Sequence, residues 1–197
     1  MISYLQGKFS FKSPTHVIIE IGGIGYHVNI SLNTWTKIQH DESGKLHTYL
    51  HITGGTQSPI AVTLFGFAEE EERMMFTELL NVSGVGASTV RMVLSALSPN
   101  DLRNAILIED AHTLERIKGI GPKTAKRIIL ELKDKVAKVI TKSDGFSPNN
   151  KLKDEALSAL IMLGFSRTPA EQAVQKAMAS NPTLTVEDII KQVLKTL

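Results

Sequence analysis

Residues 114–130 have the sequence Leu114-Glu-Arg-Ile-Lys-Gly-Ile-Gly-Pro-Lys-Thr-Ala-Lys-Arg-Ile-Ile-Leu130, which decides how the middle of this 197-residue chain folds. A short amphipathic segment ends at Ile117, and a Gly-Ile-Gly turn then leads into a long helical pattern. Pro122 suits the first position of that helix, because the N–H group that proline lacks would have no partner there. Two glycines one residue apart let the backbone turn sharply and expose N–H groups beside a helix N-terminus. The stretch therefore predicts a turn that binds an anion.

Positive charge is concentrated around this predicted turn. Residues 114–142 contain nine Lys or Arg and three Asp or Glu, although the whole chain has a formal net charge of only +2. The cations that surround Gly119 and Gly121 are Lys118, Lys123, Lys126 and Arg127. A nucleic-acid phosphate is the natural ligand for such a turn, and phosphate contacts position a strand without reading its bases. The alternative interpretation is a solvated basic helix.

The same pattern occurs a second time, 35 residues upstream. Leu79-x-x-Val82-Ser83-Gly84-Val85-Gly86-x-x-Thr89 matches Leu114-x-x-Ile117-Lys118-Gly119-Ile120-Gly121-x-x-Thr124. Two copies are too few for a solenoid, but they suit two helix-hairpin-helix units packed as one small domain. The alternative is that each Gly-x-Gly is only a tight connection between helices.

Composition narrows the class of protein. The chain has no cysteine, which excludes disulfides and thiol-based metal sites or catalysis and fits a reducing cytosol. The N-terminus lacks the basic and apolar regions of a signal peptide, and no apolar stretch is long enough to span a bilayer. With 42% hydrophobic residues, we expect a soluble globular protein without a membrane partner.

Residues 1–67 predict a small β-barrel. Five short alternating or β-branched segments are expected as strands, at 4–11, 17–21, 26–30, 45–52 and 60–67. The leading candidate is an OB-fold, which often binds oligonucleotides, although a fold alone does not prove a function. Tyr26 and Trp35 are candidates for stacking on bases, but packing in or around the barrel core is the favoured interpretation.

Residues 68–140 predict an all-helical domain. Its first helix, expected at 68–80, begins with Glu69-Glu70-Glu71-Glu72, where carboxylates suit the helix dipole. A metal-dependent nuclease site is the sharper alternative, but consecutive helical residues fan around the axis instead of converging. Ser98 and Asp110 are expected to cap two later helices.

Residues 141–150 are polar and contain Gly and Pro, which predicts a flexible linker. Residues 151–197 then predict three short helices, the last of them capped by Thr185. Such a small tethered module usually binds a partner. The candidate apolar docking surface consists of Leu160, Leu163, Phe165 and Leu194, and these residues are equally good candidates for the module's own core.

Catalytic signatures are missing from the sequence. No phosphate-binding loop for ATP is present, and the six histidines show no metal-ligand spacing, so we expect no metal and no cofactor. Lys123 is a candidate nucleophile of the glycosylase type, but a phosphate contact explains it better. We predict no catalytic residue.

These features together closely resemble the RuvA family over essentially the whole chain. The most specific motifs are the Met-Ile start, Gly22-Gly23-Ile24-Gly25-Tyr26, Leu64-Phe65-Gly66-Phe67, Gly84-Val85-Gly86, Gly119-Ile120-Gly121-Pro122-Lys123-Thr124-Ala125 and Leu163-Gly164-Phe165. The resemblance implies an α+β fold: an OB-fold barrel, a tandem helix-hairpin-helix domain and a three-helix domain similar to ubiquitin-associated domains.

The resemblance also implies a function. RuvA proteins are bacterial, cytoplasmic Holliday-junction-binding subunits that act in recombination, repair and the SOS response. They assemble as homotetramers or octamers, hold the four-way junction open and recruit the hexameric ATPase RuvB for branch migration; the resolvase RuvC is a further candidate partner. Carried over by motif, the DNA contacts are Gly84, Gly86, Gly119, Gly121, Lys123 and Arg127, and the motor contacts are Leu160, Leu163, Phe165 and Leu194.

Two departures from the family pattern bear on these expectations. Relatives often carry a lysine in the first hairpin where this chain has Ser88, and Arg91 is the candidate that compensates. The family also has an acidic turn between the last two barrel strands, at the junction centre. The corresponding segment here, residues 53–59, contains no carboxylate, and its expected central residues are Gly54, Gly55, Thr56 and Gln57. We expect this longer loop to act sterically, or the basic hairpins alone to hold the junction open.

Two other classes of protein remain as alternatives. A helix-hairpin-helix repair enzyme would need a catalytic cluster in a pocket and would turn over substrate without a partner. A pure interaction scaffold would bind DNA no more strongly than its modest charge predicts, and substitution of Lys123 or Arg127 would change little.

Overall fold

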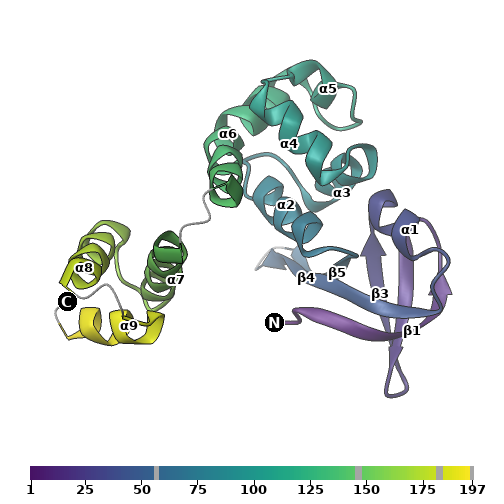
Figure 1. Cartoon of the computed structure of the whole chain (residues 1–197). Helices are drawn as coiled ribbons and strands as arrows, with labels where there is room; N and C mark the ends of the chain where they lie inside the picture. The colour runs from purple at the N-terminus through teal and green to yellow at the C-terminus, as the bar shows by residue number, and fades with distance from the viewer. Residues whose placement is uncertain (56–57, 145–147, 181–183, 196–197) are drawn as a thin grey trace. The chain divides into compact units, whose positions relative to one another are not determined.

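The computed structural model describes residues 1–55, 58–144, 148–180 and 184–195. These residues form two compact units, Met1–Ala137 and Lys138–Leu197 (Figure 1). The first unit contains the barrel and most of the helices, and the second contains three helices and the end of the helix before them.

The N-terminal barrel confirms the predicted OB-type fold. Its strands are β1 (Tyr4–Lys12), β2 (His16–Ile21), β3 (Ile24–Ile30), β4 (Ser43–Gly55) and β5 (Ser58–Phe67). They close in the order β1-β2-β3-β5-β4, in which β3 and β5 pair in parallel and the other pairs are antiparallel. Alternate residues point inward, so Val17, Ile19, Val28 and Leu46 are fully buried in the barrel core.

A helix within the barrel segment, α1 (Leu32–Ile38), was not predicted. Ser31 begins it as the N-cap, and its hydroxyl accepts a hydrogen bond from the Thr34 N–H. That serine was the local signal available in the sequence. Trp35 and Tyr26 are partly buried against the barrel core, which agrees with packing and not with base stacking.

Strands β4 and β5 are both longer than expected. The predicted strands ended at residue 52 and resumed at residue 60, but β4 runs to Gly55 and Gly55 pairs with Ser58. Gly54 has a φ of 109°, beside a register shift, which favours glycine. Of the four residues expected at the centre of this loop, Gly54 and Gly55 therefore belong to a strand, and Thr56 and Gln57 lie outside the described residues.

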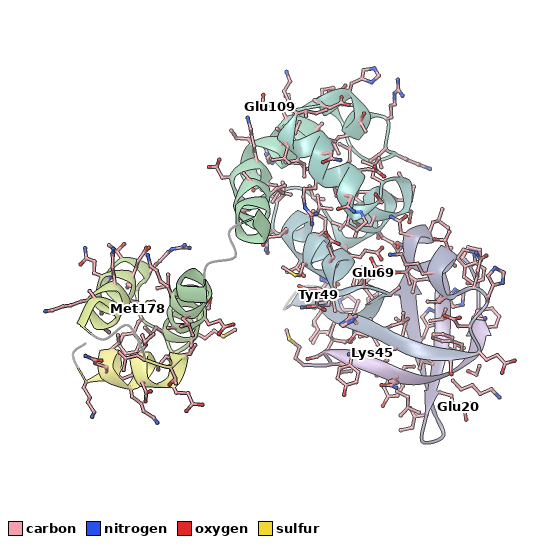
Figure 2. The ribbon with its side chains drawn as sticks, viewed as in Figure 1. Glu20, Lys45, Tyr49, Glu69, Glu109 and Met178 are labelled. Carbon is pink, nitrogen blue, oxygen red and sulfur yellow. The ribbon has the colours of Figure 1, made fainter. Side chains whose placement is uncertain are left out.

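Five helices follow the barrel: α2 (Glu70–Leu80), α3 (Ala87–Ala96), α4 (Pro99–Leu107), α5 (Ala111–Glu115) and α6 (Pro122–Asp144). Ser98 and Asp110 cap α4 and α5 as predicted. Helix α2 packs against the outside of the barrel. The ring of Phe76 in α2 contacts Phe65 and Phe67 of β5, at ring-centroid distances of 4.9 and 5.0 Å. Tyr49 projects from β4 onto the same ring of Phe76, at 5.4 Å (Figure 2). This aromatic cluster makes the barrel and the helices one compact unit.

The second unit is a three-helix module made of α7 (Pro148–Met162), α8 (Arg167–Ser180) and α9 (Val186–Leu194). Thr185 begins α9 with a reciprocal capping box to Asp188, as its position predicted. The linker predicted at 141–150 differs from the structure, because α6 continues to Asp144 and α7 begins at Pro148. In the described part of the chain, no helix has both the length and the hydropathy needed to cross a membrane.

Candidate nucleic-acid interface

The two Gly-x-Gly turns are structural copies of each other as well as sequence copies. The first lies between α2 and α3 and the second between α5 and α6. Equivalent backbone hydrogen bonds are donated by Val85 to Val82 (3.1 Å) and Ile120 to Ile117 (3.0 Å), and by Val90 to Gly86 and Ala125 to Gly121 (both 2.9 Å). The repeat therefore encodes one helix-hairpin-helix unit twice.

The first glycine of each turn is required by the backbone. Gly84 has a φ of 82° and Gly119 a φ of 94°, both in the left-handed region. An L-residue with a side chain is strained in this conformation, whereas glycine adopts it freely. These two glycines are therefore explained by folding alone.

The second glycine of each turn is not required by the backbone. Gly86 has a φ of −91°, and neither Gly86 nor Gly121 is among the residues of positive φ. A Cβ atom added at either position would meet no atom within 4 Å, and both residues are exposed. The space beside both glycines is open, so the backbone at the start of each following helix is accessible to an external ligand.

The helix N-termini at these turns offer free hydrogen-bond donors. Gly86 is the N-cap of α3 and has no side chain to accept from the first N–H groups of that helix. Together with the helix dipole, such uncapped N–H groups favour an anion. Gly121 precedes α6 in the same way, since its carbonyl oxygen accepts a helical hydrogen bond from the Ala125 N–H.

The lysines at the second turn are exposed and unneutralised. Among the described residues, no carboxylate pairs with Lys118, Lys123 or Lys126. Farther along α6 the lysines do have partners, Glu109 for Lys133 and Glu78 for Lys135. The sequence prediction of a basic region is therefore refined: among the described side chains of α6, the charge available to a ligand is concentrated at the hairpin end.

Contacts between the repeats hold the two turns together. The Arg127 guanidinium of α6 donates a hydrogen bond to the Ser83 carbonyl oxygen of the first turn, at 2.9 Å. A Cβ atom added at Gly119 of the second turn would lie 3.5 Å from the Thr89 hydroxyl of α3. Each turn therefore touches the helix of the other repeat. Arg127 was predicted only as a phosphate contact, and the structure gives its side chain this positioning contact as well.

Ser88 and Arg91, the two residues in question at the first hairpin, differ in their surroundings. Ser88 is exposed one residue into α3. Arg91 is half-buried, and its guanidinium donates to the Asn29 side-chain oxygen (3.0 Å) and to the Thr15 carbonyl oxygen (3.4 Å) of the barrel. Both acceptors are neutral oxygens, so these bonds orient the guanidinium without neutralising its charge, and the expectation that Arg91 compensates for the missing hairpin lysine stays a prediction.

The four consecutive glutamates at the start of α2 diverge, as helical geometry predicted. Glu69 pairs with Lys37, Glu70 with Arg73 and His47, Glu71 with Arg103, and Glu72 accepts from the Ser31 and Thr34 hydroxyls. The hydrogen bond from Arg73 lowers the pKa of Glu70, whereas burial raises the pKa of Glu72. Among the described residues, no three His, Cys, Asp or Glu side chains form a group that could hold a metal ion.

The expected motor-binding residues of the C-terminal module separate into core and surface. Leu160 is fully buried in the core, so the prediction that it docks a partner is wrong. Phe165 is half-buried and packs against the same core, as does Met178, which is labelled in Figure 2. Leu163 and Leu194 are 59% and 45% exposed. Met162, 89% exposed, is an apolar surface residue that the helical spacing did not single out.

The fold and the paired hairpins place this chain in the class of tandem helix-hairpin-helix proteins with an attached barrel. Residues 76–134 match the family model of the SAM-like helix-hairpin-helix tandem, residues 1–66 the RuvA N terminal domain, and residues 151–197 the RuvA C-terminal domain. The chain belongs to the RuvA family.

Curated relatives match along the full length. Proteins named Holliday junction branch migration complex subunit RuvA from Christiangramia forsetii and Flavobacterium psychrophilum are each 48% identical, over 100% of both chains. The protein of that name from Cytophaga hutchinsonii is 45% identical, over 99% of both chains. Nearly uniform coverage indicates that all three parts of this chain have counterparts in these relatives.

Proposed function

We propose that this chain is a Holliday-junction-binding subunit of a branch-migration complex and that it grips DNA arms through the backbone of its two hairpins. The observation that carries the proposal is the pair Gly86 and Gly121, which keep two helix N-termini uncovered without being needed for the fold. The lysines Lys118, Lys123 and Lys126, which pair with no carboxylate in the described part of the chain, supply the matching positive charge. Its full-length relatives carry this function in their names.

The contacts proposed for DNA are of the positioning kind. Backbone N–H groups at the two turns and the lysine side chains all suit phosphate oxygens, and such contacts carry no sequence information. A protein that acts on junctions of any sequence needs this type of recognition. Specificity for a four-way junction must then come from the arrangement of several hairpin pairs in space.

Several copies of the chain are needed for such an arrangement. One chain presents one pair of turns, which suits one DNA arm, whereas a junction has four arms related by approximate fourfold symmetry. A cyclic homotetramer presents four equivalent sites, and an octamer encloses the junction from both sides. We therefore propose a homotetramer or octamer as the acting species.

The chain acts without catalysis in this proposal. Energy for branch migration is supplied by the hexameric ATPase RuvB, which binds the exposed apolar residues Met162, Leu163 and Leu194 of the three-helix module. The resolvase RuvC is a further partner on the same junction. The complex works where the bacterial chromosome lies, in the cytoplasm.

The β4–β5 hairpin is proposed to contribute shape and not charge. Residues 53–59 contain no carboxylate, so this segment cannot repel phosphates at the junction centre by negative charge. Introducing Glu and Asp at Gly55 and Thr56 should therefore leave the rate of branch migration unchanged. A changed rate would show that charge at this segment does affect branch migration.

The proposed function is tested by gel-shift titration of a four-way junction and of a linear duplex of matched sequence, each at two salt concentrations. We expect strong preference for the junction, with affinity for both DNAs falling steeply as salt rises. Equal weak binding to both DNAs would overturn the proposal and leave a generic basic DNA binder. Substrate turnover by the chain alone would instead indicate a repair enzyme.

A further inference from the structure

Three aromatic rings form a continuous stack on the outside of the barrel. The rings of Phe11 and His16 have centroids 5.1 Å apart with an interplanar angle of 23°, and those of His16 and His27 are 4.5 Å apart at 18°. Each ring comes from a different strand, β1, β2 and β3 respectively. Phe11 is 47% exposed and His27 is also exposed. We call Phe11, His16 and His27 the ring ladder.

The ring ladder is held in place by its surroundings. The Nδ1 atom of His16 lies 3.0 Å from the Ser13 hydroxyl and 3.1 Å from the Thr15 hydroxyl, within hydrogen-bond distance of both. These contacts fix the central ring, and the two outer rings stack on it. The ladder is therefore arranged before any ligand binds, which lowers the entropy cost of binding.

The barrel core does not account for these rings. Inward-facing residues of the same strands, among them Val17, Ile19 and Val28, form the core and are fully buried. The ladder residues project from the opposite face, where burial supplies no reason for a row of rings. An ordered aromatic row on a surface is typical of proteins that stack unpaired bases.

The ring ladder adjoins the first hairpin through α3. Asn29 is the register partner of His16, and Arg91 of α3 donates hydrogen bonds to Asn29 and to Thr15. Arg91 follows Gly86 by five residues, which is about 7.5 Å along the helix axis. Helix α3 therefore connects the first turn to the strands that carry the ladder.

The face that carries the ladder has little negative charge. Strands β1, β2 and β3 contain one carboxylate, Glu20, and two lysines, of which Lys12 pairs in register with the core residue Val17 and donates to the carbonyl oxygens of Gln39 and Asp41. Glu20 pairs in register with Lys8, and Figure 2 shows it near the β2–β3 turn, at the end of the barrel away from α3. The guanidinium of Arg91 lies at the other end of this face, where the ladder is.

We propose that the ring ladder binds unpaired bases of single-stranded DNA by stacking, beside the duplex arm held at the first hairpin. This inference extends the proposed function, because it assigns a strand-separated segment of the junction to the barrel. The outer faces of Phe11 and His27 stack on bases, while Arg91 stays near the phosphates. In OB-folds generally, the face formed by strands 2 and 3 is the one that binds oligonucleotides.

The test measures binding of the full chain to a fluorescent oligothymidylate of about 15 nucleotides by anisotropy. The double variant Phe11→Ser/His27→Ser should bind it about tenfold more weakly, because each base loses a stacking partner. The variant His27→Phe keeps a ring and should retain the affinity of the unchanged protein. Equal affinity of the double variant and the unchanged protein would overturn the proposal.

A matched control removes an exposed aromatic ring elsewhere on the barrel. Tyr4 is 54% exposed, with the Lys45 ammonium 4.4 Å from its ring centroid (Lys45 is labelled in Figure 2). Tyr4→Ser should leave oligothymidylate affinity within about twofold of the unchanged protein. An equal loss in Tyr4→Ser and in the double variant would contradict a specific role for the ladder.

Two further experiments distinguish this inference from the proposed function. Lys123→Ala/Lys126→Ala should weaken junction binding far more than oligothymidylate binding, whereas the ladder variant should do the reverse. Loss of junction preference with an intact ladder effect would overturn only the proposed function. Photocrosslinking with 5-iododeoxyuridine in the oligonucleotide should modify the peptide that contains Phe11, His16 or His27, and crosslinks found only at the hairpins would overturn the ladder site.

Discussion

The guanidinium of Arg127 donates a hydrogen bond to the carbonyl oxygen of Ser83, across 44 positions of sequence and a distance of 2.9 Å. It joins the helix of the second repeat to the turn of the first. The two turns are therefore parts of one surface, and a displacement of α6 is transmitted to both.

Arg127→Ala should weaken binding of a four-way junction more than Lys126→Ala, although each removes one positive charge beside the second turn. We expect a loss of about tenfold against about threefold, because only the arginine variant also releases the first turn. Arg127→Lys should not restore binding, since a lysine lacks the planar guanidinium. Gel shifts at several salt concentrations measure the junction affinity of each variant. Equal losses of affinity in Arg127→Ala and Lys126→Ala would show that the hydrogen bond to Ser83 does not contribute to junction binding.

The glycines of each turn should respond differently to alanine. Gly84→Ala and Gly119→Ala place a side chain at positive φ and should lower the free energy of unfolding by about 1–2 kcal/mol. Gly86→Ala and Gly121→Ala meet no atom and should change the free energy of unfolding by less than about 1 kcal/mol, because alanine is a poorer N-cap but restricts the unfolded chain, yet they should weaken junction binding about tenfold. Urea unfolding and gel shifts on the same four variants separate the two roles. Undiminished binding by Gly86→Ala and Gly121→Ala would mean that no ligand approaches there.

The contribution of Glu72 to the free energy of unfolding should fall as pH rises. Its carboxylate is buried between α1 and α2, and burial raises its pKa above the usual value of 4.5. The folded state therefore retains a proton that the unfolded state releases, so this contribution is fully present below about pH 4.5 and is lost as pH rises through the folded pKa. The stability of the unchanged protein relative to Glu72→Gln should decline over that range, as measured by urea unfolding between about pH 4 and pH 8. A difference that grew with pH would contradict this account.

Substitutions of the buried and of the exposed leucines in the C-terminal module should have different effects. Leu160→Ala should lower the free energy of unfolding of the module by about 2–5 kcal/mol, because the side chain is fully buried. Leu163→Ser and Leu194→Ser change exposed positions and should leave the fold intact while reducing stimulation of the RuvB ATPase. Circular dichroism and an ATPase assay with junction DNA measure these outcomes. If both surface variants stimulated the RuvB ATPase fully, RuvB would have to bind a different part of the chain.

Much of this organisation is visible in the sequence because it depends on neighbouring residues. The 35-residue repeat, the caps at Ser98, Asp110 and Thr185, and the divergence of the glutamates from Glu69 to Glu72 follow from turn chemistry and helical periodicity. The features that the sequence analysis did not predict are those for which neighbouring residues give only a weak pattern. The short helix α1 lies within a segment whose other residues favour strands. Strand β4 extends to Gly55 and β5 begins at Ser58, in residues whose composition is typical of a loop.

By itself, the sequence determined the barrel, the two hairpins, the three-helix module and the family, since patterns of hydrophobicity, glycine and charge persist along the chain. Only the tertiary structure decided what individual side chains do. Arg91 turned toward the barrel, Arg127 reached the opposite hairpin, Leu160 entered the core, and three rings from separate strands stacked. The physical reason is that backbone conformation is set largely by nearby residues, whereas the partner of a side chain is set by distant segments that folding brings into contact.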